Sequence, residues 1–182
     1  MRREREPSAG VRPASKPAHT SPLIGYTTWR DAILSQVRDR RIGAWNALTE
    51  AGLAQSALFE LPAGSLDVAA GRDAGSRFLG LSDRPTAVFC ANDLLALGFL
   101  QTMYAAGVQV PDHVAIVGYD DIEFAAAAAV PLTSVWQPAV TMGTLAAEML
   151  LEETGEAGAV HEHRHIVLQP ELVVRSSSLP SR

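Results

Sequence analysis

Three short polar segments fall where buried strands are predicted to end. They are Asn92-Asp93, Asp120-Asp121 and Gln137, which follow the apolar runs 85–90, 114–119 and 132–136. Strand and helix patterns alternate here with short connections, which favours parallel strands. Ligands of parallel sheets bind beyond the carboxyl ends of the strands. The sequence therefore predicts a ligand pocket that carboxylate and amide side chains line.

Catalysis by these residues is not favoured. Asp120 and Asp121 are consecutive, so the second carboxylate is expected to point away from the first instead of completing an acid/base pair. The chain has no Gly-x-Ser-x-Gly elbow, phosphate-binding loop or dinucleotide-binding glycine motif. Cys90, the single cysteine, lies in an apolar run that raises a thiol pKa, which favours core packing. We predict no enzymatic activity and no cofactor.

Histidines alternate near the C-terminus at positions 161, 163 and 165. In a strand all three imidazoles would lie on one face, and three imidazoles can bind zinc. The alternative is a solvated loop that connects to the last strand. We favour the loop, and predict no metal site.

Composition restricts the class of protein. The 182 residues fit about one domain, 47% of them are hydrophobic, and the formal net charge is -5. No basic stripe of the kind that reads DNA is present. No apolar stretch is long enough to cross a bilayer, and the basic, proline-rich N-terminus is unlike a secretory signal. With a lone cysteine, the cytoplasm is the expected location.

The chain divides into a leader and an α/β region. Residues 1–22 hold four of the 11 prolines and few large apolar side chains, so we expect a disordered leader. Helices are predicted at 29–51, 67–80, 94–106, 123–129 and 138–153, and strands at 57–59, 85–90, 114–119, 132–136 and 165–174. This order predicts a mostly parallel sheet with helices on both faces.

The predicted helix 94–106 contains no charged residue. An exposed helix normally has a polar face, so we expect this helix to be covered on both sides. Its own sheet would supply one cover. A second subunit is the simplest source of the other, which predicts a homodimer through this helix.

A series of motifs resembles the effector domains of the lac/galactose (LacI/GalR) repressor family. The matching pieces are Pro85-Thr86-Ala87-Val88-Phe89-Cys90 with Asn92-Asp93, Val110-Pro111, Ile116-Val117-Gly118-Tyr119-Asp120-Asp121, Pro131-Leu132-Thr133-Ser134-Val135, Gln137-Pro138 and Pro170-Glu171-Leu172-Val173-Val174-Arg175-Ser176. Upstream, Arg40-Arg41-Ile42-Gly43 is similar to the start of the family's C-terminal subdomain. The resemblance covers about residues 30–178, and it rests on the order of the motifs instead of any single one.

The resemblance implies a type I periplasmic-binding-protein fold. In this fold two α/β subdomains enclose a cleft that takes a sugar, a nucleoside or a similar small molecule. Full members of the family dimerise through these domains and read operator DNA through a preceding helix-turn-helix, which this chain lacks. Residues 23–178 would then be a partial effector domain, essentially the C-terminal subdomain, with 179–182 as a tail.

The resemblance also implies which residues contact the ligand. Arg40, Asn92 and Asp120 match ligand-contacting positions, and Leu66 falls in a loop at a further one. Trp136 could stack on the apolar face of a sugar. Carboxylate, guanidinium and amide groups suit hydroxyls, which both donate and accept hydrogen bonds. Without the resemblance, Arg40 would read as a surface arginine, Asn92 as a helix cap and Asp120 as a turn residue.

The family places the helix after Gln137-Pro138 in the N-terminal subdomain, which is not recognisable here. The apolar residues of that helix are then expected to have no sheet to cover them; they are Val140, Leu145, Met149 and Leu150. We therefore expect a fragment, a truncated gene or a wrongly chosen start. A stand-alone or transport-type sugar-binding protein is the alternative.

Overall fold

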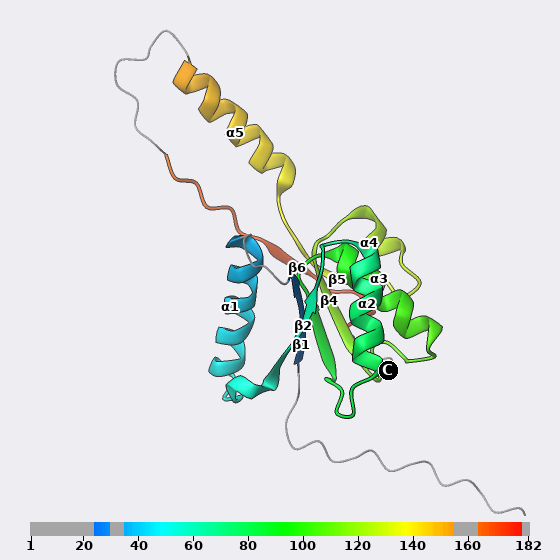
Figure 1. The fold of residues 1–182 in the computed structure, drawn as a ribbon. Coiled ribbons are helices and arrows are strands. Elements are labelled where there is room, and N and C mark those ends of the chain that lie inside the picture. The colour runs from blue at the N-terminus through cyan, green and yellow to red at the C-terminus, as the bar shows by residue number, and fades with distance from the viewer. Residues whose placement is uncertain (1–23, 30–34, 155–163, 180–182) are drawn as a thin grey trace, which may run out of the picture.

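A six-stranded sheet forms the centre of the computed structural model, which describes residues 24–29, 35–154 and 164–179 (Figure 1). The strands are β1 (Ile24–Trp29), β2 (Leu58–Ala63), β3 (Ala87–Cys90), β4 (Ala115–Asp120), β5 (Thr133–Trp136) and β6 (Glu171–Val173). Their order is β2-β1-β3-β4-β5-β6, and only β6 runs antiparallel to its neighbour. The predicted α/β fold with a mostly parallel sheet is confirmed.

Helices lie on both faces of this sheet. They are α1 (Ser35–Glu50), α2 (Val68–Leu79), α3 (Asp93–Ala105), α4 (Glu123–Ala127) and α5 (Ala139–Thr154), with a 3-10 turn at Gln55–Ala57. In Figure 1, α1 lies on one side of the strands and α2 and α3 lie on the other, while α5 projects away from the sheet. None of the described helices is long and apolar enough to cross a membrane.

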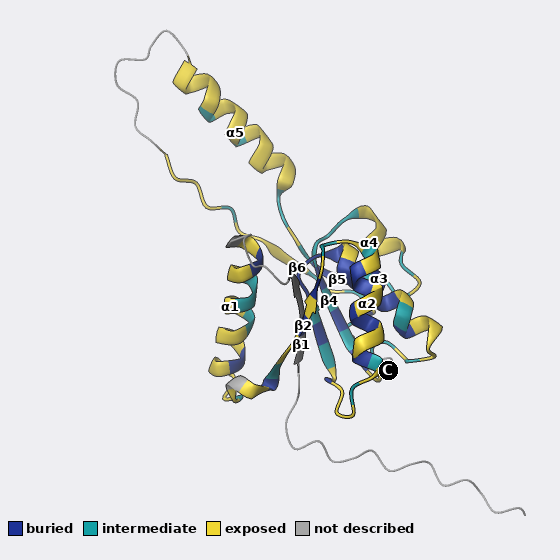
Figure 2. Cartoon of the chain, viewed as in Figure 1, coloured by how far each residue is buried: buried dark blue, intermediate teal, exposed yellow. Residues whose placement is uncertain are grey.

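The core lies between the sheet and the α2–α3 layer. Leu95, Phe99 and Met103 of α3 are fully buried, as are Cys90 and Ile116 of the strands (Figure 2). Apolar side chains that leave water in this way supply most of the favourable free energy of folding. The prediction that Cys90 packs in the core is confirmed.

Glycines allow α2 and α3 to pack unusually closely. A Cβ at Gly71 would lie 2.3 Å from the Leu95 carbonyl oxygen, and one at Gly98 would lie 2.1 Å from that of Val68. The second cover of α3, which has no charged residue after Asp93, is therefore α2 of the same chain. The lack of charge in residues 94–106 therefore does not by itself require a second subunit, and the homodimer stays a prediction.

Local predictions failed where tertiary pairing decides the conformation. Strand β1 was not predicted, and Trp29 ends this strand instead of beginning a helix. Pro62 was expected in a loop but lies within β2 at the sheet edge, where a missing N–H is tolerated. Only residues 171–173 of the predicted strand 165–174 are extended in the sheet, because β5 offers partners to these residues alone.

Some predictions lie outside the described residues or at their border. The disordered leader 1–22 is outside them, as are His161, His163 and residues 180–182 of the expected tail. His165 is described and exposed. Within the part of the chain that the structure describes, no three side chains of His, Cys, Asp or Glu come together as a metal site.

Candidate functional site

A hollow of about 760 Å3 lies at the carboxyl end of the sheet, against α1. Its lining residues come from α1, the loop before α2, and the ends of β3, β4 and β5 or the residues just after them; they are Gln36, Val37, Asp39, Arg40, Gly43, Ala44, Leu66, Phe89, Asn92, Tyr119, Asp120 and Gln137. The sequence predicted a ligand pocket beyond the carboxyl ends of the strands, and the structure has a hollow at that position. Four of the five residues predicted to contact a ligand line it, namely Arg40, Leu66, Asn92 and Asp120.

Arg40 is held in place from three sides. One guanidinium nitrogen donates a hydrogen bond to the Ala91 carbonyl oxygen at 2.6 Å. The other lies 3.6 Å from a carboxylate oxygen of Asp120, and the guanidinium carbon lies 3.6 Å from the centre of the Tyr119 ring. Cation–π stacking of this kind adds to the ion pair. The side chain is only 15% exposed, so contacts within the chain enclose most of it.

Asp120 is the second charged group of this cluster. Gln137 donates its side-chain amide to Asp120 Oδ1 at 2.8 Å. Burial raises the pKa of Asp120, and the charge of Arg40 and the hydrogen bond from Gln137 act in the opposite direction. The side chain remains 35% exposed, so part of the carboxylate can still accept hydrogen bonds from a ligand in the hollow.

Asn92 caps helix α3, as the interpretation of Asn92 as a helix cap predicted. Its side-chain oxygen accepts a hydrogen bond from the Leu95 amide at 2.9 Å, and its side-chain nitrogen donates to the Leu66 carbonyl oxygen at 3.0 Å. The side chain thus joins the start of α3 to the loop before α2. It lines the hollow while both of its polar groups are engaged within the chain.

Trp136 is not brought to the hollow. It ends β5, where it pairs with Asp120 of β4 and Glu171 of β6, and it is 39% exposed. It is absent from the described residues that line the hollow. Tyr119, by contrast, was not predicted as a site residue. A signal existed, because Tyr119 directly precedes Asp120 at the end of a buried strand.

Comparisons with known proteins give the family of this fold. Residues 23–178 match the model of the periplasmic binding protein-like domain. The chain belongs to this family. The resemblance to effector domains of the LacI/GalR repressors is confirmed by the relatives described next.

Three relatives illustrate the match. The repressor PurR of Photobacterium profundum is 36% identical over 79% of this chain and 42% of its own. The solved complex of the regulator CelR with cellobiose is 31% identical, with a TM-score of 0.72 over 85% of this chain and 46% of its own. A LacI family regulator from Lactobacillus casei with bound sucrose is 30% identical, with a TM-score of 0.68 over 86% of this chain and 57% of its own.

Two facts follow from these matches. The three relatives are described as a transcriptional repressor or transcriptional regulators. The chain spans about two fifths to three fifths of the length of these family members, so it corresponds to one part of them.

Proposed function

We propose that this chain is the effector-binding part of a LacI-type transcription regulator, and that a sugar or nucleoside-like molecule binds in the hollow beside α1. The observation that carries the proposal is the cluster of Arg40, Asp120 and Gln137 at the carboxyl end of the sheet. Related regulators bind cellobiose and sucrose, which supports a polyhydroxy ligand.

The chemistry of the cluster suits such a ligand. The free acceptor capacity of Asp120 and the remaining N–H donors of Arg40 can satisfy adjacent hydroxyl groups as a pair. A molecule that lacks those hydroxyls would leave both groups unpaired in a partly buried place, which costs free energy and gives selectivity. Leu66 and Phe89 offer apolar surface to the body of the ligand. Trp136 would contact the ligand only if the ligand extends along β5 past Asp120.

The proposed partners follow from the same assignment. The chain would act in the cytoplasm and reach operator DNA only through a helix-turn-helix domain that is not part of this sequence. A homodimer through α3 remains part of the proposal. It is supported by large apolar side chains that stay exposed on α3 and α4, namely Leu94, Tyr104 and Phe124.

The test is thermal unfolding of the full 182-residue chain with cellobiose, sucrose, galactose, adenosine, guanine or hypoxanthine. A ligand that binds the folded chain raises the unfolding midpoint with its concentration. We expect one member of the panel to do so, and expect Asp120→Ala to abolish the shift. Glu123→Ala is the matched control, since it removes an exposed carboxylate outside the hollow. A shift that survives in Asp120→Ala would contradict the proposed site.

A further inference from the structure

Two consecutive residues at the end of β4 have a left-handed backbone. Asp120 has a φ of 102° and Asp121 a φ of 50°. Residues other than glycine rarely adopt such angles, and they persist where the surrounding structure holds them. Asp120 lies at this turn and lines the hollow, so contacts that hold the turn bear on where its carboxylate lies.

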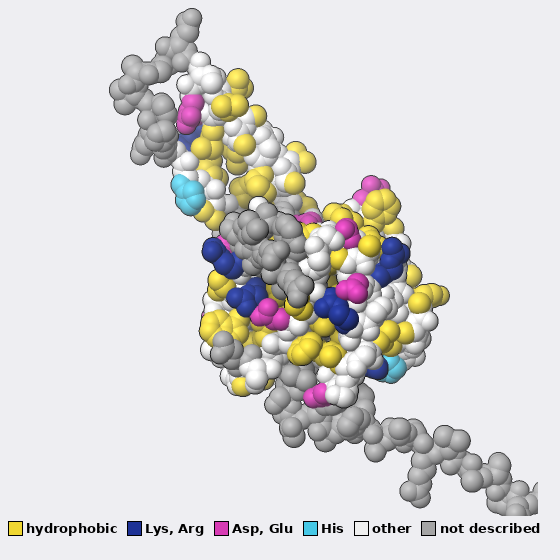
Figure 3. Space-filling view, in the orientation of Figure 1, with side chains coloured by type: hydrophobic (Ala, Val, Ile, Leu, Met, Phe, Trp, Pro, Cys, Tyr) yellow, Lys and Arg dark blue, Asp and Glu magenta, His cyan; other side chains and the backbone are white. Residues whose placement is uncertain are grey.

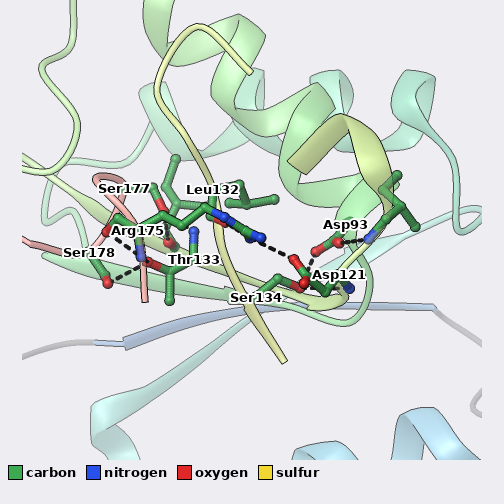
Figure 4. A network of polar contacts seen from close by, with 10 residues as sticks. Asp93, Asp121, Leu132, Thr133, Ser134, Arg175, Ser177 and Ser178 are labelled. Atoms are coloured by element: carbon green, nitrogen blue, oxygen red, sulfur yellow. Dashed lines mark hydrogen bonds and ion pairs between the residues drawn. The ribbon is translucent and has the colours of Figure 1, made fainter. Parts of the chain in front are cut away.

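The peptide groups after Asp120 are both tied to one carboxylate (Figure 4). The Ile122 amide donates to Asp93 Oδ2 at 2.9 Å. The Asp121 amide donates to Ser134 Oγ at 3.1 Å, and that hydroxyl donates to Asp93 Oδ1 at 2.6 Å. The Ile122 amide is thus bound to Asp93 directly, and the Asp121 amide is bound to it through the Ser134 hydroxyl. In both cases the final acceptor is the Asp93 carboxylate.

Asp93 lies in a place where a carboxylate is costly. It is the first residue of α3 and is completely buried, and burial raises its pKa. Its carboxylate rests directly on the backbone of β4, because a Cβ at Gly118 would lie 2.0 Å from Asp93 Oδ1. Both of its oxygens accept hydrogen bonds that serve the residues after Asp120. The position of the Asp93 carboxylate therefore allows it to stabilise the backbone of Asp121 and Ile122.

The far side of the turn has a second anchor. Arg175, which follows β6, donates to the Asp121 carboxylate at 2.6 Å and to the Leu132 carbonyl oxygen at 2.8 Å. The side chain of Asp121 is thus used to fix its own backbone position and does not line the hollow. Of the two consecutive carboxylates, only Asp120 is left facing the hollow.

We propose that Asp93 is a positioning residue of the effector site, which holds the peptides after Asp120 so that the Asp120 carboxylate meets Arg40 and Gln137. Asp93 contacts no ligand in this scheme and acts through the backbone of Asp121 and Ile122. The inference rests on the proposed function for its effect on ligand binding. The placement of Asp120 can be measured without any ligand.

The ligand-free test compares the full chain with Asp93→Asn by nuclear magnetic resonance. The reporter is the side-chain amide of Gln137, whose proton is hydrogen-bonded to Asp120. We expect this proton signal to move toward the position of a free amide in Asp93→Asn. We also expect hydrogen exchange at the Ile122 amide to accelerate on the order of tenfold or more, since its acceptor is altered.

Ser177→Ala is the matched control. Ser177 is also fully buried, and its hydroxyl donates to the Ile116 carbonyl oxygen at 2.6 Å and accepts from the Thr133 amide at 2.8 Å. This variant removes a comparable buried hydrogen-bond network that does not include the peptides after Asp120. We expect it to lower stability and to leave the Gln137 signal unchanged. A Gln137 signal that is unchanged in Asp93→Asn, or shifted equally in Ser177→Ala, overturns the proposal.

The binding test is a double-mutant cycle with cellobiose and hypoxanthine as probes. We expect Asp93→Asn to weaken binding on the order of tenfold, and to add little in an Asp120→Asn background, because the two residues act through one contact. Effects of the two substitutions that simply multiply would overturn the proposal in favour of a structural role. If Asp93→Asn does not fold, Ser134→Ala takes its place in both tests. That variant removes the hydroxyl that links the Asp121 amide to Asp93.

The two proposals can fail separately. If neither probe nor any member of the panel binds the unsubstituted chain, the proposed function fails, and the Gln137 signal alone decides the role of Asp93. If a probe binds and requires Asp120, but Asp93→Asn binds it equally well, the proposed function stands and the positioning role is overturned.

Discussion

Helices α3 and α5 are both rich in apolar residues, yet α3 is largely buried and α5 is exposed. Phe99 and Leu95 of α3 are fully buried between the sheet and α2, whereas α5 has no buried residue. On α5 the side chains of Val140 and Leu151 are 85% and 70% exposed, and yellow apolar atoms cover much of that helix in Figure 3. Apolar composition therefore says that a helix needs cover, but not which element supplies it.

The surroundings of α5 explain its exposure. The helix leaves the sheet after β5, and the chain returns through residues 164–170 to β6 (Figure 1). The residues that flank α5 form a hollow of about 420 Å3 with Met142, Leu145 and Met149. The expectation that this helix has no sheet to cover it is confirmed for the described residues. Burial of apolar surface contributes about 25 cal/mol per Å2 to folding stability. The solvent-exposed apolar surface of α5 does not make this contribution, whereas the buried surface of α3 does.

The largest expected difference in the free energy of unfolding comes from replacing a large apolar side chain of each helix by alanine. Phe99→Ala removes a ring that packs edge-on against Phe78 with centres 5.1 Å apart, and should lower the free energy of unfolding by about 3–5 kcal/mol. Leu151→Ala on α5 should change it by less than about 0.5 kcal/mol. Denaturant unfolding of both variants measures the difference. A large loss in Leu151→Ala would show that α5 is covered in solution and would break the comparison.

A smaller effect comes from one glycine in each helix. Gly98→Ala puts a methyl group against the Val68 carbonyl oxygen, and should lower the free energy of unfolding by about 1–3 kcal/mol because α2 and α3 must separate. Gly143→Ala in α5 meets nothing within 4 Å, and should raise it by up to about 1 kcal/mol through helix propensity. Thermal unfolding decides the sign in each case, and equal signs would contradict the packing described for α2 and α3.

The smallest effect compares two ion pairs. Asp121 and Arg175 are 12% and 19% exposed, so Asp121→Asn, which keeps a residue tolerant of a left-handed backbone, should cost about 1–3 kcal/mol. Glu152 of α5 and its partner Arg164 are 59% and 49% exposed, and Glu152→Gln should cost less than about 0.5 kcal/mol. Added salt should reduce the second effect and leave most of the first. Equal costs would mean that both pairs are similarly solvated.

Much of the fold could be predicted because the signals are local. Asn92 as a cap and the apolar run of β3 each act within a few residues, and the predicted α3 agrees with the structure to within one residue at each end. Strand β1 could not be predicted in this way. It is a strand because it pairs with β2 and β3 on either side, which no pattern within its own six residues records.

The position of the candidate site was predicted better than the contacts within it, and ligand binding by its residues stays a prediction. Arg40, Asn92 and Asp120 line one hollow as expected, because parallel strands bring their carboxyl ends together. Trp136 lies outside that lining, since its place at the end of β5 puts it between β4 and β6. The stacking of Arg40 on Tyr119 could not be predicted, because it depends on how α1 lies across the sheet.

The sequence by itself determined the alternation of strands and helices, the family and the end of the sheet where polar groups gather, because periodicity, caps and ordered motifs are properties of neighbouring residues. Tertiary structure alone decided that α2 covers α3 and that Asp93 holds the turn after Asp120. Those contacts join residues far apart in the chain, 29 positions between Asp93 and Ile122 and 41 between Asp93 and Ser134. Such pairs depend on the packing of α3 against β4 and β5, which no pattern of neighbouring residues encodes.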